Sequence, residues 1–125
     1  MIKIAKNIDG EIIYIEEYDE QGRIIHHKKS NGFESWNNFN ENGKLISIKD
    51  TDGFELWIEY DEQGRKIHSK NTDGFEEWFE YDGGRKLHYK DSYGHEFCKE
   101  YDENGRLIHL KDYNNDCEEW YEYED

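Results

Sequence analysis

Residues 54–74 read FELWIEYDEQGRKIHSKNTDG, and most of the 125-residue chain consists of copies of this stretch. The next copy begins at Phe75 with FEEWFEYDGGRKLHYKDSYG, and an earlier copy begins at Phe33 with FESWNNFNENGKLISIKDTDG. Later copies begin at His95 and Cys117, so equivalent positions are spaced 21, 21, 20 and 22 residues apart. A fixed period of this length indicates a repeat architecture, in which each repeat packs mainly against its neighbours.

Glycine residues divide each copy into two segments. Most of the 11 glycines follow Asp, Asn or Gln, and such dipeptides favour tight turns because glycine adopts positive φ without steric cost. The segments between the turns are rich in Ile, Phe, Tyr and Trp, as strands are. We therefore expect an all-β fold, an antiparallel meander of about six β-hairpin repeats in one twisted or half-rolled sheet. It forms a single domain over residues 1–125, with an irregular N-terminal cap at residues 1–18.

Two kinds of turn alternate, and matching opposed side chains predicts a register for each. Across the short turn at residues 71–74, Lys70 faces Glu76 and His68 faces Trp78, so opposite charges and rings meet. Across the long turn at residues 61–64, the same matching predicts the pairs Tyr60–Arg65, Glu59–Lys66, Ile58–Ile67 and Trp57–His68. A slip of one residue would move every side chain to the other face of the sheet.

This register gives the sheet two unlike faces. One face is apolar and aromatic, with Phe54, Leu56, Ile58, Tyr60 and Ile67 and their equivalents. The other face carries Glu-Trp-Glu on one strand and Lys-His-Lys on the next. The central row of this polar face is predicted to read His26, Trp36, Ser47, Trp57, His68, Trp78, His88, Cys98, His109 and Trp120.

The charge of the chain limits its partners. With 31 acidic and 16 basic residues, the formal net charge is −15, which excludes a nucleic-acid backbone as a partner because phosphate binding needs a basic surface. The N-terminal sequence lacks the apolar core of a signal peptide, and no apolar run reaches the roughly 20 residues that span a bilayer. Cys98 and Cys117 occupy different repeat positions, so we expect free thiols in a cytoplasmic protein.

The block from Trp78 to His88, with its Tyr-Asp and Gly-Arg elements, resembles bacterial relatives of the MORN repeat. The Tyr-Asp-x-x-Gly-Arg element is also similar to the YD repeat of Rhs shell proteins. The resemblance covers roughly residues 14 to 125 and implies a meander of hairpins. Bacterial families with such repeats include small immunity proteins, or antitoxins, that neutralise a cognate toxin in the cytoplasm. The resemblance therefore implies that this chain binds and blocks a basic toxin domain, such as a nuclease.

The polar face supplies a candidate partner-binding site. Interfaces are anchored by buried aromatic residues and surrounded by charged groups, and a row of tryptophans within a frame of carboxylates has this form. The predicted set is Trp36, Trp57 and Trp78 with Glu34, Glu55, Glu59, Glu76 and Glu80. We expect no cofactor and no enzymatic activity, because catalysis needs one perturbed site rather than the same acids in every repeat.

Other functions remain open at this stage. His88, Cys98 and His109 fall in one predicted row on three adjacent strands, and these side chains are good zinc ligands. The exposed aromatics also suit a carbohydrate-binding repeat of the cell wall, and the repeats themselves suit a structural scaffold. The sequence does not specify the toxin or the oligomeric state.

Overall fold

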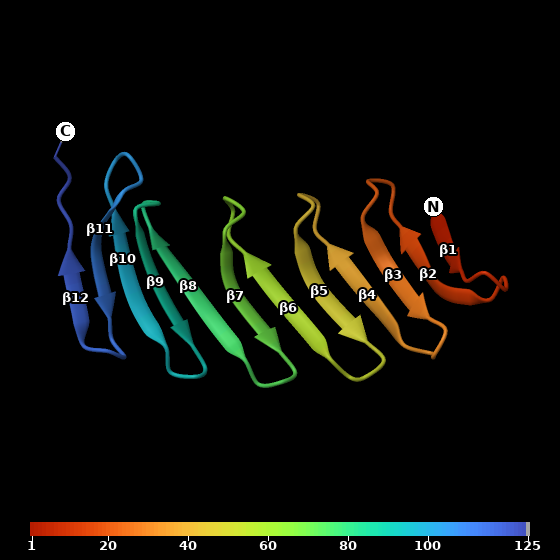
Figure 1. Ribbon diagram of the computed structural model, residues 1–125. Helices are drawn as coiled ribbons and strands as arrows, with labels where there is room; N and C mark the ends of the chain where they lie inside the picture. Colours follow the sequence, from red (N-terminus) through yellow and green to blue (C-terminus); the bar gives the residue numbers. More distant parts are fainter. Residues whose placement is uncertain (125) are drawn as a thin grey trace. The chain divides into compact units, whose positions relative to one another are not determined.

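A computed structural model describes residues 1–124 of the chain. These residues form one sheet whose strands are hydrogen-bonded in sequence order, each antiparallel to the next where their register is described (Figure 1). The predicted all-β meander of hairpins is therefore confirmed. The strands of the described residues are β1 (Ile2–Lys6), β2 (Ile12–Tyr18), β3 (Ile24–Lys29), β4 (Glu34–Phe39), β5 (Leu45–Asp50), β6 (Glu55–Tyr60), β7 (Lys66–Asn71), β8 (Glu76–Asp82), β9 (Lys86–Asp91), β10 (Glu96–Tyr101), β11 (Leu107–Asp112) and β12 (Cys117–Trp120). The described residues include no helix long and apolar enough to cross a membrane.

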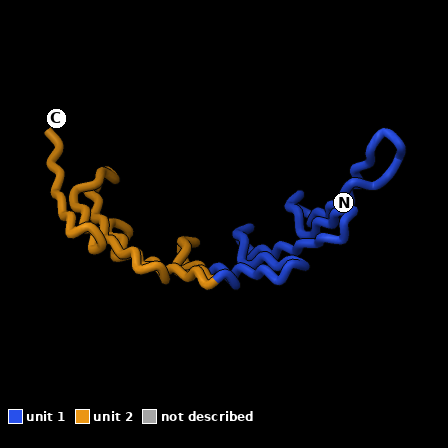
Figure 2. The backbone as a smooth tube through the Cα atoms, turned by 60° about the horizontal axis from the view of Figure 1, so that its bottom comes forward, with its two compact units in different colours: residues 1–58, 71–73 blue, residues 59–70, 74–125 orange. Residues whose placement is uncertain are grey.

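The chain divides into two compact units (Figure 2). Unit 1 comprises residues 1–58 and 71–73, and unit 2 comprises residues 59–70 and 74–125. In unit 1, a register shift between Ala5 and Lys6 makes the first hairpin, β1 with β2, irregular. The two units contain equivalent copies of the repeat, so a feature of one unit can be compared directly with its counterpart in the other.

The short turns have the predicted register. In unit 2, His68 lies opposite Trp78 and Lys70 lies opposite Glu76. In unit 1, His26 lies opposite Trp36 in the same way. Matching charges and rings across these turns was therefore enough to fix the pairing of the two strands.

The predicted register of the long turns is wrong. Where the pairing is described, the tryptophan of the first strand lies opposite a residue two positions further along the second strand than predicted. Trp36 lies opposite Lys49 rather than Ser47, and Trp78 lies opposite Lys90 rather than His88. Three hairpins have one extra residue in one strand. The ladder pairs Tyr18 with Ile24, Phe39 with Leu45 and Tyr101 with Leu107, and it then skips Ile25, Ile46 and Ile108. Such a bulge interrupts the alternation of side chains between the two faces.

The turn that includes Asp61 shows how a long turn is closed. Asp61 itself closes this turn, since its N–H donates to the carbonyl of Arg65 at 2.8 Å. Oδ1 of Asp61 accepts hydrogen bonds from the N–H groups of Gln63 and Arg65, and Oδ2 accepts one from Nε of Arg65 at 2.8 Å. The Arg65 side chain therefore belongs to the turn, where the carboxylate of Asp61 holds it.

Neighbouring short turns are joined to the preceding strand by a repeated hydrogen bond. The hydroxyl of Thr51 accepts from the N–H of Glu34, and the hydroxyl of Thr72 accepts from the N–H of Glu55, each at 3.1 Å. Serine and asparagine occupy the same position in later repeats and make the same contact. Each repeat thereby satisfies a backbone donor of the repeat before it, which is how stacked repeats stabilise one another.

The sheet has no apolar core of the usual kind. None of the hydrophobic side chains in residues 1–124 is buried, and the two buried residues are Ser69 and Asp91, at 3% and 7% exposure. Ser69 and Tyr89 donate hydrogen bonds to Glu77 at 3.0 Å each, and Nζ of Lys66 lies 2.5 Å from the same carboxylate. Burial alone would raise the pKa of Glu77, but these three donors outweigh it and lower the pKa. The apolar face of unit 2 is thus held by a charged network that the sequence did not predict.

Candidate functional site

The predicted tryptophans are accessible. Trp36, Trp57 and Trp78 have exposed fractions of 38%, 45% and 39%. Trp36 and Trp57 lie on β4 and β6 of unit 1, and Trp78 lies on β8 of unit 2. A half-exposed indole keeps apolar surface available to a partner, and aromatic side chains of this kind are enriched at the centres of protein interfaces.

Two of these indoles are held in place by stacked imidazoles. The ring of Trp36 stacks on His26, with centroids 5.2 Å apart and planes 9° from parallel. The ring of Trp78 stacks on His68 at 5.8 Å and 15°. Trp57 lies opposite Ser47 instead, so its indole lacks the support that the histidine gives at the other two positions.

The predicted carboxylates separate into two groups. Glu34 and Glu76 belong to the support of the indoles, because Glu34 lies 3.0 Å from Nε2 of His26 and Glu76 lies 2.6 Å from Nε2 of His68. The hydrogen bond to Glu76 raises the pKa of His68, and partial burial opposes this shift. Such half-buried groups have little freedom to bind a partner, since their hydrogen-bonding capacity is used within the sheet.

Glu59 and Glu80 form the accessible group. The side chain of Glu59 is 66% exposed and lies 3.3 Å from His68. The side chain of Glu80 is 83% exposed and lies 3.9 Å from His88. Glu55 is intermediate, at 32% exposure with Nζ of Lys49 3.6 Å away. Histidines stand near the two accessible glutamates, since His68 contacts Glu59 and His88 lies directly opposite Glu80.

A hollow opens beside each supported indole. In unit 2, the backbone ladder between β7 and β8 runs from the Lys70–Glu76 pair to the His68–Trp78 pair. Beyond it, the hydroxyl of Tyr81 donates to the carbonyl oxygen of Lys66 at 2.8 Å, a role normally taken by a backbone N–H. The hollow at this point, which we call the unit 2 notch, has a volume of about 620 Å³ and is lined by Glu59, Asp61, Arg65, Ile67, His68, Trp78, Phe79, Glu80 and Tyr81.

Unit 1 contains the same hollow, 42 residues earlier in the chain. This unit 1 notch has a volume of about 380 Å³ and is lined by Glu17, Asp19, Arg23, Ile25, His26, Trp36, Asn37, Asn38 and Phe39. Each lining residue is the counterpart of a lining residue in the unit 2 notch. The main chemical difference is that Asn38 stands where unit 2 has Glu80.

An arginine forms one wall of each notch without contributing net positive charge. The guanidinium of Arg65 lies 4.4 Å from the ring centroid of Tyr81, and that of Arg23 lies 4.7 Å from the ring centroid of Phe39. Asp61 and Asp19 neutralise these two arginines at 2.8 Å and 2.7 Å. The remaining carboxylates of the unit 2 notch are Glu59, which lies 3.3 Å from His68, and Glu80.

The zinc alternative is not supported by the pairing. His88 does lie opposite Cys98, but His109 lies opposite Glu100, and Cys98 lies opposite Lys111. The residues therefore do not form the single row predicted from the sequence. Among residues 1–124 there is no group of three His, Cys, Asp or Glu side chains arranged to hold a metal ion. Both thiols are free, at Cys98 and Cys117.

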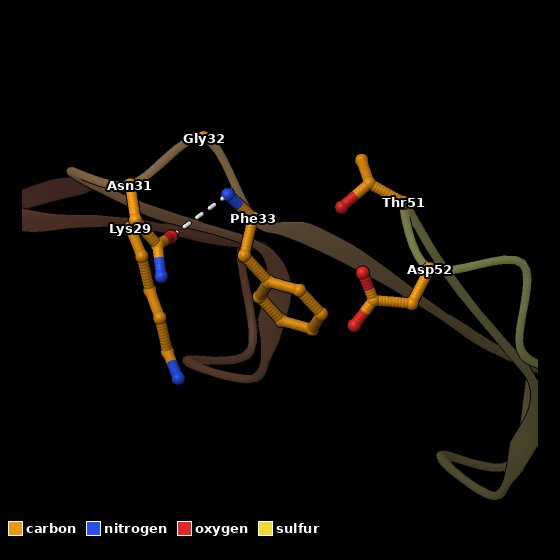
Figure 3. Close-up of a pocket in the computed structure, with 6 residues that line it drawn as sticks. All are labelled: Lys29, Asn31, Gly32, Phe33, Thr51 and Asp52. Atoms are coloured by element: carbon orange, nitrogen blue, oxygen red, sulfur yellow. Dashed lines mark hydrogen bonds between the residues drawn. The ribbon is translucent and has the colours of Figure 1, made fainter.

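A third hollow, of about 500 Å³, lies between two short turns of unit 1 (Figure 3). Nζ of Lys29 lies 5.2 Å from the ring centroid of Phe33 on one side, and Thr51 and Asp52 form the other side. The N–H of Phe33 donates to Asn31, as the dashed line in Figure 3 shows. The hydroxyl of Thr51 accepts from the N–H of Glu34, so this side of the hollow is part of the contact between two stacked turns.

Comparisons with known proteins show the fold and little more. No protein-family model matches the chain, and no curated protein matches its sequence. A chain in a crystal structure of TcdB2–TccC3–Cdc42 is similar over 89% of this chain, with a TM-score of 0.59 and 10% identity. A chain in a structure of the Photorhabdus luminescens Tc holotoxin pore is similar over 94% of this chain, with a TM-score of 0.61 and 15% identity. In both cases the match spans only 8% of the other chain.

Proposed function

We propose that this chain is a protein-binding repeat module that acts as an immunity protein, binding and neutralising a bacterial toxin domain in the cytoplasm. The observation that carries the proposal is the set of half-exposed indoles on the polar face, at Trp36, Trp57 and Trp78, each with glutamates nearby. Aromatic anchors of this kind provide affinity at interfaces, and surrounding charges provide rate and specificity. A binding role suits the chain better than a catalytic one, because a glutamate recurs two residues before the Trp position of each repeat, at Glu34, Glu55, Glu76, Glu96 and Glu118.

The structural comparisons support a connection with toxin systems at the level of the fold. The two similar structures are described as a TcdB2–TccC3–Cdc42 complex and as a Tc holotoxin pore. These are assemblies of protein chains, so the same type of hairpin sheet occurs in a toxin complex. We extend this connection to a partner of toxin origin for the present chain, which corresponds to a small part of each of those chains.

The partner that fits best has a basic surface. The net charge of −15 accelerates association with a basic protein and makes association sensitive to salt. Toxin domains with basic substrate clefts, such as nucleases, meet this requirement. When such a domain is bound to the polar face, the sheet covers its cleft and its substrate cannot enter.

Co-expression with a toxin domain encoded by a neighbouring gene tests this proposal. We expect the chain to restore growth of cells that express the toxin domain and to co-purify with it. The double variant Glu59→Lys and Glu80→Lys should slow association at low salt. The control is Glu103→Lys with Glu62→Lys, which makes the same charge change at two exposed turn positions. An association rate that both double variants reduce equally would show that only net charge matters and that the polar face is not the interface.

One alternative shares the same observation. Half-exposed indoles beside carboxylates also bind sugars, so the chain could serve as a carbohydrate-binding module. Titration with a soluble chitin or peptidoglycan fragment distinguishes the two functions. Saturable binding of the sugar with no toxin partner would favour the carbohydrate function, and binding of neither would leave a structural scaffold.

A further inference from the structure

The two notches are equivalent in position but differ in charge. In the unit 2 notch, the rim carries two exposed carboxylates, Glu59 and Glu80, whose only described contacts with the sheet are long ones to histidines. In the unit 1 notch, the position of Glu80 is held by Asn38, whose amide donates to the hydroxyl of Ser47 at 2.9 Å. Three lining positions differ between the notches, with Asn37, Asn38 and Phe39 in unit 1 and Phe79, Glu80 and Tyr81 in unit 2, and of these only the change at Glu80 alters the charge.

The unit 2 notch combines three features that favour one class of ligand group. It is a hollow of about 620 Å³, it is walled by the indole of Trp78, and it carries carboxylates at its rim. An indole attracts cations through the negative face of its ring, and a carboxylate pairs with cations directly. The lining arginine, Arg65, is already paired with Asp61 at 2.8 Å, so the acids at the rim are not neutralised by it.

Among protein cations, arginine fits these features better than lysine. The guanidinium group is planar, so it can lie against an aromatic ring while its N–H groups pair with a carboxylate. The sheet already uses this arrangement internally, since Arg65 lies on the ring of Tyr81 while it pairs with Asp61. Although His68 stacks on the ring of Trp78, 39% of the Trp78 surface stays exposed, so Trp78 and Glu80 offer the same combination, an aromatic surface and a carboxylate, to a group from outside.

We propose that the unit 2 notch is a binding site for the guanidinium group of an arginine side chain, and that the unit 1 notch is a weaker copy of it. The natural source of the arginine rests on the proposed function, since a basic toxin domain would supply it. The recognition itself depends only on Trp78, Glu59 and Glu80. Asn38 lacks the charge of Glu80, and this difference sets the order of affinity of the two notches.

The indole N–H resonances of Trp36 and Trp78, followed by NMR, report on the two notches separately. The probe is N-acetyl-arginine methylamide, and the control is the citrulline analogue, which has the same shape and no charge. We expect the arginine probe to shift the Trp78 resonance with an affinity of about millimolar order, as suits one exposed contact. The Trp36 resonance should shift at higher probe concentration, and citrulline should move neither.

Exchanging the residue that differs between the notches tests the assignment further. Glu80→Asn should weaken binding at Trp78 by about two- to fivefold, the range of a solvent-exposed ion pair. Asn38→Glu should strengthen binding at Trp36 by a similar factor. Glu103→Gln, a neutralising change at an exposed turn, serves as the control and should change neither. Opposite responses to the two exchanges, with no response to the control, would support the proposal even if one variant were less stable.

Three results would overturn the proposal: equal shifts with citrulline, equal responses of Glu80→Asn and Glu103→Gln, or a response of Trp78 to a chitin fragment but not to arginine. The probe titration needs no toxin, so its outcome is separate from that of the proposed function. Failure of the toxin domain to co-purify would remove the immunity role and leave the notch intact. Failure of the titration would remove the notch and leave the immunity role to be decided by co-purification.

Discussion

Nε2 of His68 lies 2.6 Å from Oε2 of Glu76, and the same imidazole stacks on Trp78. The arrangement occurs again at His26 with Glu34 and Trp36. A histidine between two glutamates is stabilised when it is protonated, because both neighbours are negatively charged. At Trp78 the polar face therefore has a hydrogen-bonded frame whose strength depends on pH.

The first prediction follows from the raised pKa of His68. Because the folded-state pKa lies above the ordinary value of 6.5, protonation of His68 stabilises the fold fully below pH 6.5 and ceases to do so as the pH rises through the folded-state pKa. We expect the free energy of unfolding of the wild type to exceed that of His68→Phe by more at pH 5.5 than at pH 8. Phenylalanine retains a ring that can stack on Trp78. Urea unfolding at both pH values measures the difference, and a difference that does not change with pH would contradict the prediction.

The second prediction compares a tryptophan with a glutamate on the same strand. Trp57→Ala should lower the free energy of unfolding by about 1–2 kcal/mol, since half of a large apolar side chain is lost from the sheet. Glu55→Ala removes a side chain whose ion pair with Lys49 is solvent-exposed and contributes about 0–1 kcal/mol. Urea unfolding curves of the two variants give the comparison. Equal losses would show that the indole contributes little to the stability of the sheet.

The third prediction concerns the bond between repeats at Thr72. Thr72→Val keeps the shape of the side chain but removes the oxygen that accepts from the N–H of Glu55. The free energy of unfolding should fall by about 0.5–1.5 kcal/mol, the usual contribution of one hydrogen bond. Thr72→Ser keeps the hydroxyl and is the matched control, with serine already present at the equivalent Ser92. If the valine and serine variants were equally stable, the hydroxyl would have no role in stacking.

The fourth prediction concerns the end of the β7–β8 ladder, where the hydroxyl of Tyr81 takes the place of a backbone donor. Tyr81→Phe leaves the carbonyl of Lys66 without this partner and should cost about 0.5–1.5 kcal/mol. Phenylalanine occurs naturally at the equivalent Phe39, where the amide of Asn37 donates to the carbonyl of Ile24 instead. Asn37→Leu should therefore destabilise unit 1 by a similar amount. Thermal unfolding of the two variants checks both; a Tyr81→Phe protein as stable as the wild type would show that water replaces the hydroxyl.

The repeated short turn made much of this structure predictable. Opposed charges and rings around Asn71–Gly74 fix the pairing of His68 with Trp78, and the glycine spacing gives the order of the strands. The bulges were missed because a register without them also paired Glu59 with Lys66 and Tyr60 with Arg65. A signal was present in the pairs of adjacent apolar residues Ile24-Ile25, Leu45-Ile46 and Leu107-Ile108, which do not fit strict alternation.

The notches were not predictable in the same way. Their position depends on where the ladder between two strands ends, and at that point the side chain of Tyr81 or Asn37 takes the place of a backbone donor. The sequence located the tryptophans and glutamates that line the polar face, but it did not show which of the glutamates bind histidines. Glu76 and Glu80 flank the same tryptophan in the sequence, and only their exposures in the folded chain, 28% and 83%, separate them.

The absence of buried hydrophobic side chains in the described residues also affects how the protein responds to temperature. The heat capacity change of unfolding follows the apolar area that becomes hydrated, and this sheet already exposes much of that area when folded. We therefore expect a value per residue below the 12–15 cal/mol/K that is roughly typical of globular domains. A smaller heat capacity change makes the curve of stability against temperature flatter. Such a protein gains only modest stability at its optimum temperature, but it loses that stability slowly on cooling.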